Sequence, residues 1–110
     1  MYKVTKANEA YRYEAPGHFD VRTTRLHDPE DVGGAVTMGL SHFLPGGGAE
    51  MAEAKKELVY YIIKGEMTVS FDDGSSVKLE RGDSIHIAAG TNRAIENTGI
   101  ASAQMLVVLV

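Results

Sequence analysis

Residues 57–80 read ELVYYIIKGEMTVSFDDGSSVKLE, and this stretch decides the fold class. Apolar and polar residues alternate along Glu66–Phe71 and again along Ser75–Glu80, as they do in strands with one dry face. Asp72-Asp73-Gly74 lies between the two runs and is typical of a hairpin turn that needs a positive φ. The stretch therefore predicts an antiparallel hairpin. Val59–Ile63, which precedes it and is apolar throughout, predicts a strand covered on both faces.

Further strands are predicted on either side of this stretch. Phe19–Leu26 alternates in the same way, and Val36–Leu44 is another candidate. Met105–Val110 is apolar throughout and predicts a second strand covered on both faces. Turn residues recur about every ten positions, which favours short antiparallel strands over alternating helices and strands. The predicted class is all-β.

One segment disagrees with this class. Ala49–Leu58 consists almost entirely of strong helix formers, so propensity alone predicts a helix there. Its apolar stripe is thin, and an exposed helix of this length is marginal. The sequence leaves helix and strand open for this segment.

Composition limits the classes of function. A chain of 110 residues has room for one domain, and without cysteine it has no disulfide, thiolate nucleophile or zinc–cysteine site. The formal charge of −4 comes with no basic block, so we expect no nucleic-acid partner. No apolar run approaches the length of a bilayer span and the start has no signal-like segment. We therefore expect no membrane association and a cytoplasmic location.

Two motifs suggest a family. Leu44–Gly48 followed by Glu57–Glu66 resembles the first motif of the cupin superfamily, and Gly82–Asn97 resembles the second. The resemblance implies a double-stranded β-helix, the jelly-roll barrel of antiparallel strands, with a ligand site in its mouth. It implies one cupin domain over 1–110, with N-terminal strands and a loop in 1–34 and the conserved barrel core in 35–110. It also implies a homodimer, which would help a core this small.

The metal ligands of the family are replaced in this sequence. Metal-binding cupins supply a His-X-His pair and a glutamate from the first motif and a third histidine from the second. The resemblance places Ala52, Ala54, Leu58 and Arg93 at those positions, and a one-residue shift of the pair gives only Met51 and Glu53. Alanine, leucine and arginine side chains have no lone pair to offer a cation. We therefore expect neither a metal nor another cofactor.

The same resemblance predicts which side chains face the cavity. It points Leu58, Tyr60 and Ile62 inward from one strand and Arg93, Ile95 and Asn97 inward from another, because successive side chains alternate faces. Arg93 becomes a permanent charge in a largely apolar barrel, and a buried guanidinium needs a carboxylate from the protein or from a ligand. The predicted ligand is a small anionic metabolite. Its predicted contacts are Arg93, Tyr60, Ser41, Asn97, Leu58, Ala52 and Ala54.

His86 is the predicted catalytic residue if the protein is an enzyme. Histidine titrates near neutrality, so a metal-independent lyase or isomerase would use His86 for proton transfer while Arg93 holds a carboxylate. This requires His86 to face the cavity, and the sequence does not fix its face.

Three other interpretations stay open. In the first, the protein is a non-catalytic module that binds or senses a small ligand. In the second, it keeps a metal through ligands relocated to His86, Glu53 or Glu57. In the third, Arg93 pairs with Glu53 or Glu57 and needs no ligand.

Overall fold

The computed structural model describes all of residues 1–110, which form nine strands and one short 3-10 helix. The elements are η1 Ala7–Glu9, β1 Tyr11–Tyr13, β2 His18–His27, β3 Thr37–Glu53, β4 Leu58–Lys64, β5 Glu66–Phe71, β6 Ser76–Glu80, β7 Ser84–Ile87, β8 Asn92–Glu96 and β9 Ala103–Leu109. The all-β prediction is confirmed. The chain has no helix of the length and apolarity needed to cross a membrane.

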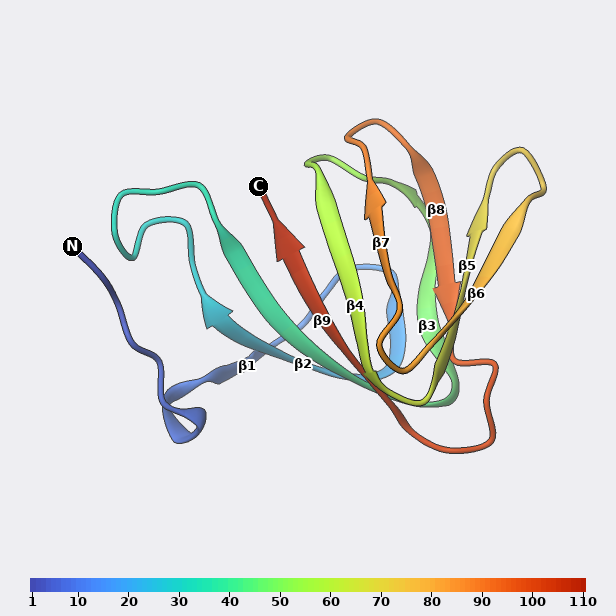
Figure 1. Ribbon diagram of the computed structural model, residues 1–110, viewed down its shortest axis with the longest axis horizontal. Helices are drawn as coiled ribbons and strands as arrows, with labels where there is room; N and C mark the ends of the chain where they lie inside the picture. Colours follow the sequence, from blue (N-terminus) through green and yellow to red (C-terminus); the bar gives the residue numbers. More distant parts are fainter.

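The strands form one antiparallel sheet that folds over on itself. Their order is β6-β5-β8-β3-β9-β4-β7, with β2 paired to β3 and β1 to β2. The long strand β3 is the joint, because residues 37–43 pair with β9 whereas Gly48–Glu53 pairs with β8. Figure 1 shows the two layers that result, with β9, β4 and β7 in one and β8, β5 and β6 in the other. This is the jelly-roll arrangement that the resemblance implied.

The β5–β6 hairpin forms where the sequence predicted it. Its turn contains Gly74 with a φ of 87°, a conformation that glycine adopts without strain. Met67 pairs with Leu79 on the buried face. Val77, however, is exposed, because β6 is an edge strand of the sheet and nothing covers that end of it.

The segment with helical propensity is extended. β3 continues as a strand to Glu53, and Ala52 pairs with Arg93 across to β8. A strand partner far along the chain satisfies the backbone groups that a helix would have satisfied locally. Tertiary pairing therefore decides against the intrinsic preference of these residues.

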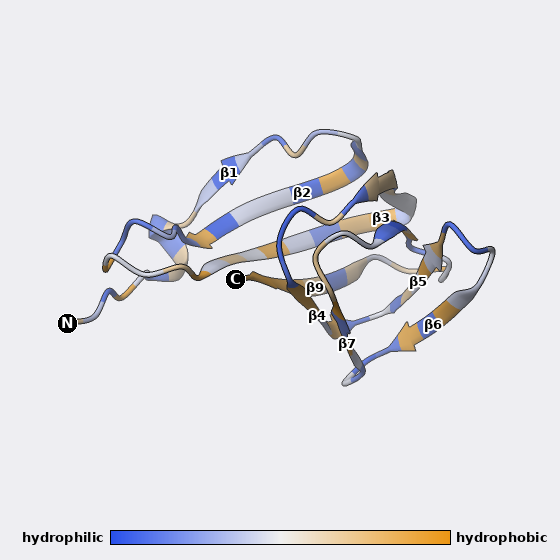
Figure 2. Ribbon diagram, turned by 90° about the horizontal axis from the view of Figure 1, so that it is seen from above, coloured by the Kyte–Doolittle hydropathy of each residue, from blue (hydrophilic) through white to orange (hydrophobic).

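The core lies between the inner faces of the two layers. Leu58, Tyr60 and Ile62 of β4 are buried, while Tyr61 and Ile63 between them are 44% and 39% exposed. The prediction that this strand is covered on both faces is therefore wrong. Figure 2 shows that β4 and β9 are nonetheless largely hydrophobic along their length. The outer side of β4 and β9 is thus an uncovered apolar surface.

Candidate functional site

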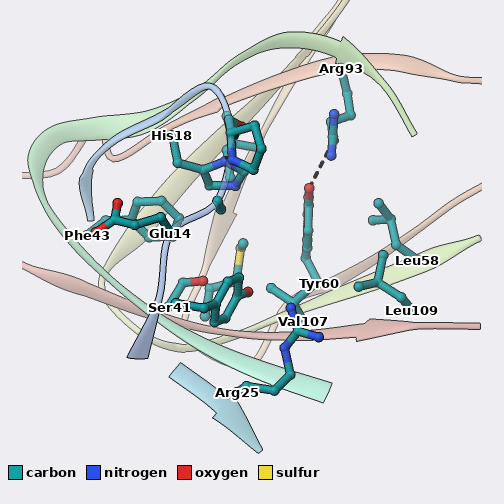
Figure 3. A pocket seen from close by; sticks show the side chains of 15 residues that line it. Glu14, His18, Arg25, Ser41, Phe43, Leu58, Tyr60, Arg93, Val107 and Leu109 are labelled. Carbon is teal, nitrogen blue, oxygen red and sulfur yellow. Dashed lines mark hydrogen bonds between the residues drawn. The ribbon is translucent and has the colours of Figure 1, made fainter. Parts of the chain in front are cut away.

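The barrel contains a cavity of about 290 Å³. Its walls come from the inner faces of β3, β4, β8 and β9, and residues 13–16 with His18 and Arg25 of β2 complete the lining. Figure 3 shows the side chains that converge on it. Most of the wall is apolar, and its polar side chains are Tyr13, Glu14, His18, Arg25, Ser41, Tyr60 and Arg93.

Arg93 and Tyr60 form the polar centre at one end of the cavity. The Arg93 Nε donates to the Tyr60 hydroxyl oxygen at 3.0 Å, and Nη1 donates to the Ala52 carbonyl at 2.9 Å. Figure 3 shows the first of these bonds. Burial raises the pKa of the Tyr60 phenol, although the Arg93 charge and hydrogen bond act in the opposite direction. Tyr60 is therefore a neutral hydroxyl at physiological pH.

Arg93 meets no carboxylate of the protein. None of the ion pairs in the structure includes it, and Glu57 pairs with His86 instead. The interpretation in which Glu53 or Glu57 neutralises Arg93 is therefore wrong. A tyrosine hydroxyl and a backbone carbonyl satisfy part of the half-buried guanidinium, and no carboxylate of the protein pairs with its charge.

Several predicted contact residues lie in the wall. Ser41 of β3 and Leu58 of β4 are buried and line the cavity together with Tyr60 and Arg93. The alternation of each strand brings them there, because Ser41 shares its face with the buried Phe43.

Three other predicted contacts do not line this cavity. Ala54 is buried, but neither of the two larger clefts includes it. Ala52 is exposed and lines a neighbouring cleft of about 340 Å³. Asn97 is 1% exposed and bonds to the backbone of Phe43, Ala101 and Gly99, so its role is structural. The alternation of the strand correctly pointed Asn97 inward, but it did not show that Asn97 lies away from the cavity wall.

His86 does not face the cavity. It lies on the outer side of β7, exposed to solvent, and its Nε2 is 2.6 Å from Glu57 Oε1. The buried face of that strand carries Ile87. The prediction that His86 transfers a proton inside the barrel is therefore wrong, because it requires the side chain to point into the cavity.

His18 and Arg25 also line the cavity, although no pattern in the sequence predicts this position for them. His18 also lines the neighbouring cleft, as does Arg93. Its Nδ1 is 2.9 Å from the Pro16 carbonyl, which can only accept, so Nδ1 carries the proton in the neutral ring and Nε2 is an acceptor. Both residues belong to the N-terminal segment, whose position depends on the pairing of β2 with β3.

The chain does not provide a metal site of the usual kind. No three side chains of histidine, aspartate or glutamate come together anywhere in the structure. His86 and Glu57 do meet, but on the outside of the barrel and without a third donor. The alternative with relocated metal ligands needs such a convergence, and these residues do not fit it.

The sequence is similar to that of a mycobacterial protein. It is named beta-D-galactosidase Rv1717, from Mycobacterium tuberculosis strain ATCC 25618 / H37Rv. The two sequences are 41% identical over 107 residues, which cover 96% of this chain and 90% of the relative.

Solved structures share the fold at lower identity. The polyketide cyclase RemF from Streptomyces resistomycificus aligns with a TM-score of 0.83 at 20% identity, covering 99% of this chain and 79% of that one. A predicted oxalate decarboxylase from Thermotoga maritima also gives 0.83, at 24% identity and with 98% of each chain covered. These similarities carry the fold alone.

The family follows from the sequence match and the architecture together. The cupin domain model Cupin_2 matches residues 39–109, which include β4 to β9 and most of β3. The chain belongs to the cupin superfamily.

Proposed function

We propose that this cupin binds a small carboxylate-bearing metabolite in its barrel, with Arg93 as the anchor of the negative charge. The observation that carries the proposal is the half-buried Arg93 guanidinium, which no protein carboxylate neutralises. Its Nε and Nη1 bonds to Tyr60 and Ala52 fix its orientation. A carboxylate that accepts from the remaining N–H groups would form a charge-assisted hydrogen bond in a partly dry site.

The cavity wall supports a ligand with an apolar body. Leu58, Val107 and Leu109 are apolar residues of this wall. The cavity volume of about 290 Å³ is near the lower limit for small-molecule sites. Hydroxyls come from Tyr60 and Ser41. Since His86 lies outside, binding rather than proton transfer by that residue is the function that the geometry supports best.

Calorimetric titration with hexanoate and with the neutral, isosteric hexanamide tests this proposal. We expect hexanoate to bind more tightly, and Arg93→Gln to weaken its affinity roughly ten-fold or more without changing that of hexanamide. Arg81→Gln is the matched control, because it removes the same charge from an exposed position outside every cavity. Equal binding of the two compounds, or an equal effect of the two substitutions, would refute the proposal.

A second candidate function is hydrolysis of β-D-galactosides, and the relative named as a beta-D-galactosidase favours it. Glycosidases commonly use two carboxyl groups on either side of the scissile bond. Glu14 lines the barrel cavity, while Glu50 and Glu53 line the neighbouring cleft, and both spaces include His18 and Arg93. Glu14, Glu50 and Glu53 are therefore the carboxylates available to a galactoside bound next to Arg93.

Release of nitrophenol from 4-nitrophenyl β-D-galactopyranoside tests the second candidate. Turnover that Glu14→Gln or Glu53→Gln abolishes, and that the exposed control Glu30→Gln leaves intact, supports it. Absence of turnover by the wild-type protein, or turnover that all three variants keep, excludes this role.

A further inference from the structure

Ser41 carries a buried hydroxyl in the wall of the barrel cavity. Its side chain points inward from β3 on the same face as Phe43, and it pairs across the sheet with Met105 of β9. All three residues line the cavity, and Ser41 is only 4% exposed. A hydroxyl in apolar surroundings destabilises the folded protein unless it is hydrogen-bonded. The Ser41 hydroxyl therefore needs a partner.

The protein itself provides no partner for this hydroxyl. None of the side-chain hydrogen bonds in the structure includes Ser41. Thr23, which pairs with Ser41 on β2 and is equally buried, donates its hydroxyl to the Tyr13 carbonyl instead. Thr37 is the other buried hydroxyl without a bond, but it begins β3 and lines none of the cavities. Ser41 thus carries the unpaired buried hydroxyl inside the barrel.

The Ser41 hydroxyl is open to the cavity. The one polar side-chain atom that is both inaccessible and unpaired in the structure is the Arg25 Nε, so the unpaired Ser41 Oγ keeps accessible surface. Ser41 lines the barrel cavity and no other cleft, which places that surface inside the barrel. A ligand in the cavity can therefore reach the hydroxyl.

Ser41 lies well away from the polar centre formed by Arg93 and Tyr60. Ser41 pairs with Met105 and Tyr60 with Val107, so Ser41 and Tyr60 are two strand spacings apart across the sheet and two residues apart along it. This register separates their Cα atoms by about 12 Å. Figure 3 shows the Tyr60 hydroxyl directed toward Arg93, with Ser41 on the other side of the view. The cavity therefore offers two separate polar positions.

An uncharged hydroxyl is the ligand group that suits Ser41 best. Ser41 carries no charge and its neighbours Phe43 and Met105 are apolar, so an ionised group beside it would lose its hydration without compensation. The serine hydroxyl both donates and accepts hydrogen bonds. A ligand hydroxyl can take both roles, whereas a ligand carbonyl only accepts.

We infer that the ligand is a short hydroxy acid, whose carboxylate binds Arg93 and whose hydroxyl, toward the other end of its chain, binds Ser41. This inference rests on the proposed function, in which Arg93 holds the carboxylate. The hydrocarbon between the two groups lies against the apolar wall, to which Val107 belongs. Buried polar groups are paired in the great majority of cases, and the ligand supplies the partner that the protein lacks at Ser41.

Calorimetric titration with terminal hydroxy acids tests the inference, each against the alkanoate in which a methyl group replaces the hydroxyl. The pairs are γ-hydroxybutyrate with pentanoate, δ-hydroxyvalerate with hexanoate and ε-hydroxyhexanoate with heptanoate. We expect the best-fitting hydroxy acid to bind the wild-type protein more tightly than its alkanoate. Ser41→Ala should lower this ratio of affinities roughly ten-fold without weakening the alkanoate. Ser102→Ala is the matched control, because Ser102 is exposed and lies outside every cavity.

Thermal unfolding of the free protein gives a second test that needs no ligand. Removing a buried hydroxyl that makes no hydrogen bond leaves no partner unsatisfied, so Ser41→Ala should keep or raise the unfolding midpoint. Thr23→Val keeps the side-chain shape but leaves the Tyr13 carbonyl without its donor, so it should lower the midpoint. If Ser41→Ala lowers the midpoint as much as Thr23→Val does, the Ser41 hydroxyl has a partner in the protein and the inference is overturned.

The outcomes separate the two proposals. If Arg93→Gln weakens the alkanoates but no hydroxy acid binds better than its alkanoate, the inference about Ser41 is overturned and the role of Arg93 stands. The same holds if the hydroxy acid keeps its advantage in Ser41→Ala. If neither class of acid binds, or if Arg93→Gln changes neither affinity, the proposed function fails and the inference falls with it.

Discussion

Asn97 ties together three stretches of backbone directly after β8. Its Nδ2 donates to the Phe43 and Ala101 carbonyls, and its Oδ1 accepts from the Gly99 amide at 2.9 Å. Asn97→Ala would leave these buried groups without partners, so we expect a loss of about 2–3 kcal/mol in the free energy of unfolding. Ligand affinity at temperatures where the variant is folded should not change.

Urea denaturation measures this effect, and Asn92→Ala on β8 is the control. Asn92 makes one exposed hydrogen bond to Asp72, so its loss should cost less than about 0.5 kcal/mol. Equal destabilisation by both substitutions would contradict the structural role of Asn97.

Tyr60 should make stability depend on alkaline pH. Burial raises its pKa in the folded state, so the unfolded chain loses the phenol proton first, near pH 10. The stabilisation that the protonated Tyr60 phenol contributes to the folded state is fully present below about pH 10. It is lost as the pH rises through the folded-state pKa. We expect Tyr60→Phe to show a smaller loss of unfolding free energy between pH 9 and 11 than the wild type. Tyr11, whose pKa is also raised, by its hydrogen bond to Asp28, is present in both proteins and cancels.

The sequence predicted part of the site at this scale. Alternation placed Tyr60 and Leu58 correctly, because residues two apart on a strand share a face whatever the rest of the chain does. His18 and Arg25 were missed because no local pattern reports where a strand far along the chain will pair. The orientation of His86 had a local signal that was not used: Ser84 and His86 share one face of the short strand and two isoleucines share the other, which favours an outward His86.

Among the elements, β3 depends on glycine where it turns from one layer to the other. A Cβ added at Gly48 would lie 1.9 Å from the Ile95 carbonyl oxygen, an approach that rigid backbone cannot relieve. We expect Gly48→Ala to lower the free energy of unfolding by more than about 3 kcal/mol. Gly34→Ala, where the nearest atom would be 3.9 Å away, should be neutral or slightly stabilising. A chemical denaturation midpoint that moves equally in both variants would contradict this account of the joint.

Element types were more predictable than their environments. The β5–β6 hairpin follows from turn chemistry and alternation, which act locally. The conformation of residues 49–58 could not be predicted from local preference. Its helix-forming residues continue β3 only because β8 pairs with them. The apolar run in β4 correctly marked a strand, but its hydrophobicity does not distinguish a buried outer face from an exposed one.

For the whole molecule, the uncovered apolar surface on the outer side of β4 and β9 bears on the predicted homodimer. Tyr61 and Ile63 are exposed there, and they lie beside the half-buried Leu106. Contiguous exposed apolar area of this kind is typical of association surfaces. We expect light scattering to give twice the chain mass of 11.9 kDa for the wild type and the single mass for a Tyr61→Lys, Ile63→Lys double variant.

Val77→Lys controls for added charge, because Val77 is an exposed apolar residue on β6, away from this surface. It should leave the mass unchanged. A wild-type protein that is monomeric at micromolar concentration would contradict the homodimer prediction.

The central claim concerns the charge inside the barrel, and a crystal structure with a bound carboxylate tests it most directly. Crystals grown with adipate should show one carboxylate within hydrogen-bond distance of the Arg93 guanidinium, and Tyr60 should keep its bond to the Arg93 Nε. A carboxylate bound elsewhere, with Arg93 turned out of the cavity or paired to a protein carboxylate, would contradict the account.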